Sequence, residues 1–277
     1  MHRLEAFRNI AAQASRGELA FPTHVNAALK LQDALGDPGC RIDAATRLVQ
    51  AEPLLAARTV AIANSAAYNR AGHEVTSVKS AVQRVGFRTL NALVASVIVR
   101  QLNSAVRDPG LREMSNRLWE HSAHVAALSM VIARRVTRVD PETALFAGIV
   151  HEIGGFYLLS RAEEYPGLLE GEADEWIEHG EVEVGRAVLL KLGVPHQVLD
   201  AIEAMWAGIR VLPPATLGDT LMLANDLSPV PSPLHQHPDA TSHQAAVTID
   251  FTHGNGTLAG ILDESAGEVR SLTEALR

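Results

Sequence analysis

Two histidines and one glutamate are the residues whose types and spacing could hold a metal ion. His121 lies in the stretch LWEHSAHVA, and His151 and Glu152 are neighbours in ALFAGIVHEIGG. Imidazole nitrogens and carboxylate oxygens are common ligands of Zn²⁺, and an ion with one open position can activate water. Two histidines that face a helical core are, however, more often held by hydrogen bonds than by a metal.

The helical spacing predicts that these two histidines meet. His121 shares an apolar stripe with residues three and four positions away, so it should point inward. On the next helix, His151 shares one face with Gly148 and Gly155, and such small residues let another helix come close. We therefore expect His121 and His151 to lie together across two packed helices.

The elements that carry these residues are expected to be helices throughout. Of the 277 residues, 47% are apolar and 4% aromatic, alanine is abundant, and alternating runs of β-branched residues are scarce. The predicted fold class is all-α, a multi-helix bundle. The expected helices lie at about 21–35, 43–52, 53–69, 77–87, 88–103, 113–138, 142–154, 168–178, 181–193, 195–208 and 217–227, with two short helices at 256–277.

Proline and glycine residues indicate where helices begin and where the chain divides. Asp43 is expected to cap one helix, and Asp140 followed by Pro141 another. The stretch RDPGLRE separates two helical patterns. We predict an N-terminal helical subdomain at 1–106 packed on a second helical subdomain at 112–277.

Composition argues against several classes of partner. The formal net charge of −8 is unfavourable for nucleic-acid binding, which needs a positive surface. The longest apolar stretches, such as ALVASVIV, are too short to span a bilayer, and the charged N-terminus does not resemble a secretory signal. We expect a cytoplasmic protein without membrane contacts. The single cysteine, Cys40, rules out an internal disulfide and a cysteine-type zinc site.

Two further groups of residues have a functional and a plain interpretation. The Pro- and His-rich segment 228–244 is predicted to be a loop with little to bury; its His235, His237 and His243 could bind zinc, but no element fixes their geometry. Three arginines could contact an acidic partner or a phosphate, although helical arginines usually form a solvated face. These arginines are Arg84, Arg88 and Arg100.

The chain resembles the HDOD family, a divergent branch of the HD-domain superfamily, along nearly its whole length. The resemblance rests on segments that occur in order at compatible spacing. In the first half they are PTHVNAALKLQDAL, IDAATRLVQAEPLLAARTVAIANSAAYN and SAVQRVGFRTLNALV, and in the HD-like half LWEHSAHVA, ALFAGIVHEIGGFYLL, EVGRAVLLKLGVPHQVLDAIEAMW and LMLANDL. The resemblance implies a helical bundle, a regulatory role in bacterial signalling and, usually, no hydrolytic activity.

The resemblance also shows where this chain departs from active HD phosphohydrolases. Those enzymes hold metal with a His, then a His-Asp pair, then a later Asp. His121 and His151 match the histidines, Glu152 replaces the paired Asp, and Asn225 stands at the later Asp. Related cyclic-dinucleotide hydrolases add a lysine and further histidines; this chain has Gly155, Glu181, Met205 and Trp206 at those positions.

These departures predict a scaffold that has lost its chemistry. A neutral amide such as that of Asn225 is a poor ligand for a divalent cation, and the adjacent Asp226 is turned by about 100° on a helix. We expect no catalytic residue, no metal and no cofactor. The predicted function is a non-enzymatic adaptor that binds signalling proteins through its N-terminal half and the groove between the halves.

Two alternatives remain open. A residual metal-dependent phosphohydrolase or phosphodiesterase could use His121, His151 and Glu152, with Asp226 recruited as a further ligand. A small-ligand sensor, for example of a nucleotide, could use the old HD cavity, although the chain has no glycine-rich phosphate loop.

Overall fold

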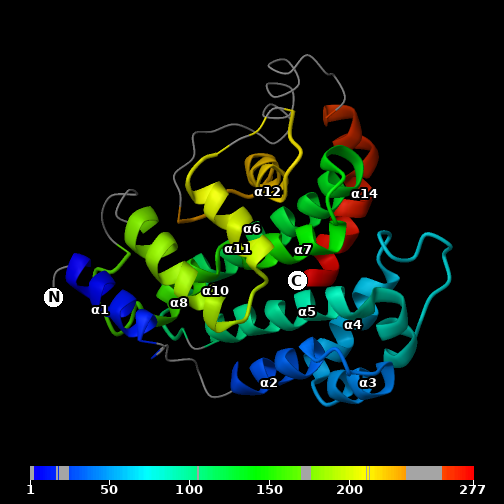
Figure 1. Cartoon of the computed structure of the whole chain (residues 1–277), viewed down its shortest axis with the longest axis horizontal. Helices are drawn as coiled ribbons and strands as arrows, with labels where there is room; N and C mark the ends of the chain where they lie inside the picture. The colour runs from blue at the N-terminus through cyan, green and yellow to red at the C-terminus, as the bar shows by residue number, and fades with distance from the viewer. Residues whose placement is uncertain are drawn as a thin grey trace.

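The fold is a bundle of helices, as predicted (Figure 1). The computed structural model describes residues 3–16, 18, 25–104, 106–169, 176–209, 211, 213–234 and 258–277. Within these ranges every regular element is helical. The abundance of alanine and leucine accounts for this, because both favour helix and few strand-forming runs compete with them.

The first half of the chain is built around one long helix. The helices are α1 (Arg3–Ser15), α2 (Val25–Gly36), α3 (Ile42–Gln50), α4 (Pro53–Asn64) and α5 (Val78–Ser104). Figure 1 shows α5 crossing the middle of the molecule, where it packs against α2, α3, α4 and, from the second half, α7.

A kink at Gly86 divides α5. The two helices predicted at 77–87 and 88–103 therefore form one kinked element. Gly86 has a φ of 75°, a backbone conformation that only glycine adopts at little cost.

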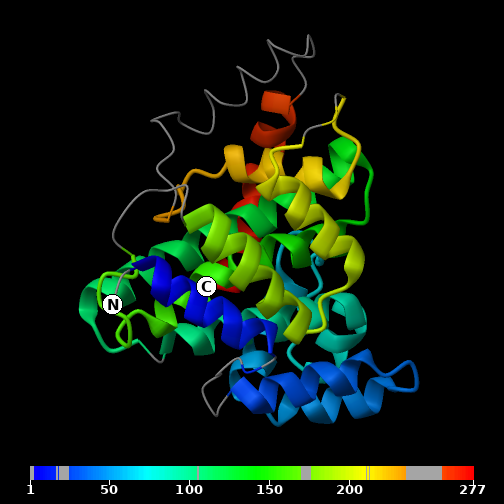
Figure 2. The same ribbon diagram turned by 60° about the vertical axis from the view of Figure 1, so that its left-hand side comes forward.

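The second half surrounds another central helix, α6 (Pro109–Ile132). Its other elements are η1 (Ala133–Thr137), α7 (Pro141–Val150), α8 (Ile153–Arg161), η2 (Trp176–Gly185), α10 (Arg186–Lys191), α11 (His196–Trp206), α12 (Leu217–Asp226) and α14 (Leu258–Leu276), of which η1 and η2 are π-helices. α6 packs most extensively against α7 and also contacts α12 and α14. Figure 2 shows α14 beside this core, and α14 also contacts α4 of the first half.

The helix beginnings follow the expected capping pattern at one position and differ at two others. The Asp140 side chain accepts a hydrogen bond from the Thr143 backbone N–H, with Pro141 in the first turn, as predicted. The prediction for Asp43 is wrong: it lies within α3 and pairs with Lys79, while α3 has no side-chain cap. α6 begins earlier than predicted, because Asp108 caps it.

Several predicted helix bounds are also wrong. The helix expected at 142–154 stops at Val150, and a turn at His151 and Glu152 leads into α8. The end of the chain forms one long helix, α14, in place of two short ones. Of the helix expected at 168–178, residues 168 and 169 form a turn, residues 170–175 lie outside the described ranges, and residues 176–178 begin η2. The division into subdomains at 106 and 112 stays a prediction.

Two long apolar helical stretches lie in the core of the bundle. Val78–Leu102 and Pro141–Arg161 are long and apolar enough to cross a membrane by composition. Their most apolar windows are 67% and 89% buried inside the fold. This burial accounts for their composition, because helices in the core are apolar on most sides.

Candidate functional site

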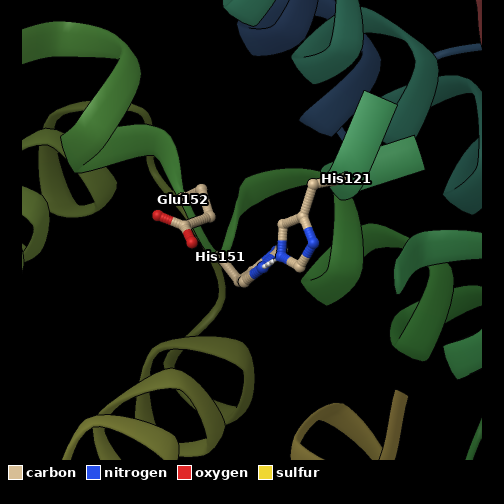
Figure 3. Close-up of side chains that lie close together, drawn as sticks. All are labelled: His121, His151 and Glu152. Atoms are coloured by element: carbon tan, nitrogen blue, oxygen red, sulfur yellow. Dashed lines mark hydrogen bonds between the residues drawn. The ribbon is translucent and has the colours of Figure 1, made fainter. Parts of the chain in front are cut away.

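The His-Glu pair lies at the break between α7 and α8, and His121 faces it from α6 (Figure 3). His151 ends α7, and Glu152 follows with backbone angles that leave the helical region. All three side chains are buried, with exposures of 2% for His121, 3% for His151 and 3% for Glu152. The turn matters because it directs the imidazole and the carboxylate inward from two successive residues.

Close packing of α6 on α7 brings the histidines together. A Cβ atom on Gly148 would lie 2.7 Å from the backbone nitrogen of Ala126 and closer still to its Cα atom. No side chain larger than hydrogen fits there, so the helices approach to backbone contact. The rings of His121 and His151 are consequently only 5.4 Å apart between centroids. This meeting of the two histidines confirms the expectation from helical spacing.

Hydrogen bonds fix the orientation of both rings. The Nδ1 atom of His121 lies 2.7 Å from the carbonyl oxygen of Val230, and that of His151 lies 2.8 Å from the carbonyl oxygen of Gly148. A carbonyl oxygen can only accept, so both Nδ1 atoms carry the donated proton. The two Nε2 atoms face each other at 3.3 Å.

This arrangement calls for a positive charge between the rings. With both Nδ1 atoms protonated, neutral rings would direct two Nε2 lone pairs at each other, which is repulsive. A proton on one Nε2 atom would convert the contact into a hydrogen bond. A metal cation held by both nitrogens would have the same effect.

The residues present fit a single metal ion, but with few ligands. Ligand atoms of His121, His151 and Glu152 all lie within 4.8 Å of one another. Two nitrogens at about 2.0–2.1 Å from a tetrahedral ion are roughly 3.3 Å apart, and metal-bound histidines often donate their other N–H to a carbonyl. Among the described residues, neither Asp226 nor Glu181 joins this cluster.

The remaining position of the predicted set lies on a neighbouring helix. Asn225 is half-buried in the last turn of α12, which packs against both α6 and α7. Its amide is neutral, so it contributes no negative charge to the cluster. In the part of the chain that the structure describes, Glu152 is therefore the one carboxylate of the cluster.

The start of the predicted loop covers the site. Besides the bond from His121 to the carbonyl of Val230, Leu234 packs over Gly155, where an added Cβ atom would collide with the Leu234 side chain. The space for a side chain at Gly155 is therefore filled by leucine. Residues 228–234 form a loop, as predicted, with Pro229 and Pro231 exposed, but Ser232 is buried and Leu234 packs against the core.

This covering segment could not be recognised from composition alone, because proline and serine residues dominate it. The rest of the predicted loop, with His235, His237 and His243, lies outside the described residues.

The other positions that differ from the hydrolases take part in packing. Trp206 lies against Gly185, where an added Cβ atom would be 3.3 Å from the indole ring, and Gly185 in turn packs against Gly154 of α8. Met205 is partly buried against the core, and Glu181 is 6% exposed. Trp206 thereby links α11 to η2, and Gly185 links η2 to α8.

The arginines considered for an acidic ligand have partners within the fold. Arg84 donates to the carbonyl of Ala63, and exposed Arg88 pairs with Asp140 at 2.7 Å. Arg100 does not form part of a solvated face, since its guanidinium lies 5.7 Å from the centroid of the Trp119 ring.

A second arginine beside Trp119 was missed by the sequence reasoning. Arg58 is 5% exposed and also lies 5.7 Å from the Trp119 ring. Its guanidinium donates to the Ser96 hydroxyl at 3.2 Å. Burial, and then the charge of Arg100, lower the pKa of Arg58 to about 10. The sequence did not indicate that Arg58 is buried against Trp119, because Arg58 stands alone within an apolar helix.

Comparison with known proteins identifies a family that matches most of the chain. The model of the HDOD domain family matches residues 21–206. A search among curated proteins found no match.

Solved structures share the fold at low identity. A "Putative metal-dependent phosphohydrolase" from Shewanella amazonensis SB2B has a TM-score of 0.74 and 19% identity, with 99% of both chains covered. An HDOD domain protein of unknown function from Geobacter sulfurreducens has a TM-score of 0.65 and 22% identity, again with 99% of both chains covered. A "Putative signal transduction protein" from Marinobacter aquaeolei VT8 has a TM-score of 0.61 and 18% identity; the match covers 99% of this chain and 66% of that one.

Proposed function

The chain belongs to the HDOD family, and from this premise we propose that it is a non-enzymatic regulatory protein of bacterial signal transduction. It acts by binding other proteins on a degenerate HD scaffold. The observation that carries the proposal is the cover over the former metal site. Val230 holds the ring of His121 through its carbonyl, and Leu234 fills the space above Gly155.

The chemistry of the cluster supports the same proposal. Hydrolysis on an HD scaffold needs an ion with an open position and a path for a substrate phosphate. Here all three cluster side chains are at least 97% buried, and the residue beside them that could have contacted phosphate is a glycine. A buried, covered cluster is better suited to hold the helices in register than to turn over a substrate.

Binding to a native partner is the direct test. The purified chain is immobilised, a lysate of its source bacterium is passed over it, and a retained protein is identified, purified and titrated back by calorimetry. We expect a saturable complex of defined stoichiometry, formed equally well by wild type and by His121→Gln/His151→Gln. Failure of every retained protein to bind in the purified system would contradict the adaptor role.

A second candidate is a residual metal-dependent phosphohydrolase. It is favoured by the convergence of the Nε2 atoms of His121 and His151 beside the Glu152 carboxylate. These three residues would hold the ion, which would supply activated water and charge stabilisation. Release of product from a panel of phosphomonoesters and phosphodiesters with added Mn²⁺, Fe²⁺ or Zn²⁺, abolished in His151→Gln, would favour this candidate over the adaptor.

A further inference from the structure

A pocket of about 780 Å³ lies between the two halves of the molecule. Its wall is formed by α2, α5, the beginning of α7 and the α10–α11 connection. These elements come from both halves, so the pocket exists only in the assembled fold. Its volume lies within the range of about 300–1,000 Å³ that is typical of ligand-binding sites.

The charges on the wall are predominantly negative. Its carboxylates belong to Asp33, Asp140 and Glu142, and Arg88 is the one cationic side chain that the described residues contribute to it. Arg88 is engaged by Asp140 at 2.7 Å, and Asp140 also caps α7. This ion pair neutralises Asp140, so the wall keeps the negative charges of Asp33 and Glu142. Burial, and then the nearby charge of Asp140, raise the pKa of Glu142, and a cation beside this carboxylate would favour its charged form.

The neutral polar groups of the wall also favour a positive charge. Gln32 donates through Nε2 to the carbonyl of Leu192 at 2.9 Å, which fixes its amide. The Oε1 atom of Gln32 and the Oδ1 atom of Asn91 are buried, and no donor among the described residues reaches them. The partial negative charges of these two oxygens add to the charge of the nearby carboxylates.

We propose that this pocket receives a basic segment of a partner protein, with an arginine or lysine side chain inserted between α2 and α7. The proposal rests on the adaptor function proposed above and names the chemistry of its partner. An arginine is well suited, because its guanidinium has five donors and carries a permanent charge. The carboxylates of Asp33 and Glu142 can each accept hydrogen bonds from such a group.

The test uses a fluorescein-labelled tri-arginine peptide as the probe, with binding followed by fluorescence anisotropy at about 150 mM salt to screen non-specific attraction. The pocket variant is Asp33→Asn/Glu142→Gln. The matched control is Glu74→Gln/Glu113→Gln, which removes the same charge from exposed positions outside the pocket. We expect the pocket variant to bind at least about tenfold more weakly and the control to change less than about twofold. Equal weakening in both variants, or no binding to wild type, would overturn the proposal.

A second measurement locates the bound probe directly. A tri-lysine peptide is coupled to carboxylates of the wild-type chain with a carbodiimide, and the linked residues are mapped by mass spectrometry. Cross-links concentrated at Asp33 and Glu142 are expected, whereas an even distribution over the acidic surface would contradict the proposal.

The basic-segment pocket and the adaptor function can fail independently of each other. A native partner that binds wild type and the pocket variant equally would refute the pocket while leaving the adaptor function intact. Phosphohydrolase activity that needs His151 would refute the adaptor function without affecting the peptide result.

Discussion

The Nε2 atoms of His121 and His151 face each other at 3.3 Å, and each ring is held at its other nitrogen by a backbone carbonyl. Three separate segments therefore meet at this pair: α6, the end of α7 and the residues around Val230. The pair connects the covering segment to the helical core. Unfolding experiments measure what this pair contributes to stability, and metal analysis tests whether it has a chemical role.

Replacing the histidines tests this structural role. His121→Ala and His151→Ala should each lower the free energy of unfolding by about 1–3 kcal/mol, because each strands a buried hydrogen-bonding group. The double variant should lose less than the sum, with a coupling of about 0.5–1.5 kcal/mol, because the rings contact each other. Urea unfolding measures all three values. His73→Ala, at an exposed position, is the control and should have little effect. Strict additivity would show that the two rings do not interact.

Metal content tests the loss of the HD centre. We expect purified protein to contain far less than one equivalent of manganese, iron or zinc by elemental analysis, because within the described ranges a single carboxylate accompanies the two histidines. Added Zn²⁺ should raise the melting temperature of wild type by no more than a degree or so beyond the shift that it causes in His121→Ala/His151→Ala. One bound equivalent that disappears in the double variant would reverse this prediction.

The close approach of α6 and α7 makes Gly148 sensitive to substitution. Gly148→Ala should lower the free energy of unfolding by about 2–3 kcal/mol, because the new methyl group collides with the backbone of Ala126, which cannot move aside cheaply. Gly267→Ala on α14 is the matched control. Nothing lies within 4 Å of its added Cβ atom, so a gain of about 0.5–1 kcal/mol is expected from helix propensity. Thermal unfolding followed by circular dichroism compares the two, and equal effects would contradict the close packing.

The capping carboxylate of α12 makes stability depend on pH. Burial would raise the pKa of Asp219, but hydrogen bonds from the Thr216 hydroxyl and from the backbone N–H groups of Val211, Ala215 and Thr216 hold it below the ordinary value of 3.8. Because the folded-state pKa is the lower one, the stabilisation is complete above the unfolded pKa and is lost as pH falls through the folded pKa.

Asp219→Asn should therefore be less stable than wild type by about 1–2 kcal/mol near neutral pH. The difference should stay constant down to about pH 5 and shrink below about pH 4. Urea unfolding over this range measures it, with Asp200→Asn on the exposed face of α11 as control. A difference that grows on acidification would contradict the assigned hydrogen bonds.

The helical class and the facing of the two histidines could be predicted from the sequence, because both depend on local patterns. A residue every three or four positions lies on one helix face, and Asp140 with Pro141 begins a helix through contacts within one turn. Gly148 in the same way indicated a close helix contact before its partner Ala126 was known.

What only the tertiary structure decided depends on residues far apart in the chain. Val230 and Leu234 belong to a Pro- and Ser-rich stretch without periodicity, and their place over His121 and Gly155 follows from how α12 packs on α6 and α7. The pocket that joins Asp33 to Glu142 likewise requires both halves to be assembled. Local propensity acts through neighbours in sequence, whereas a covered site and an acidic pocket arise only when distant surfaces are brought together by burial of the core.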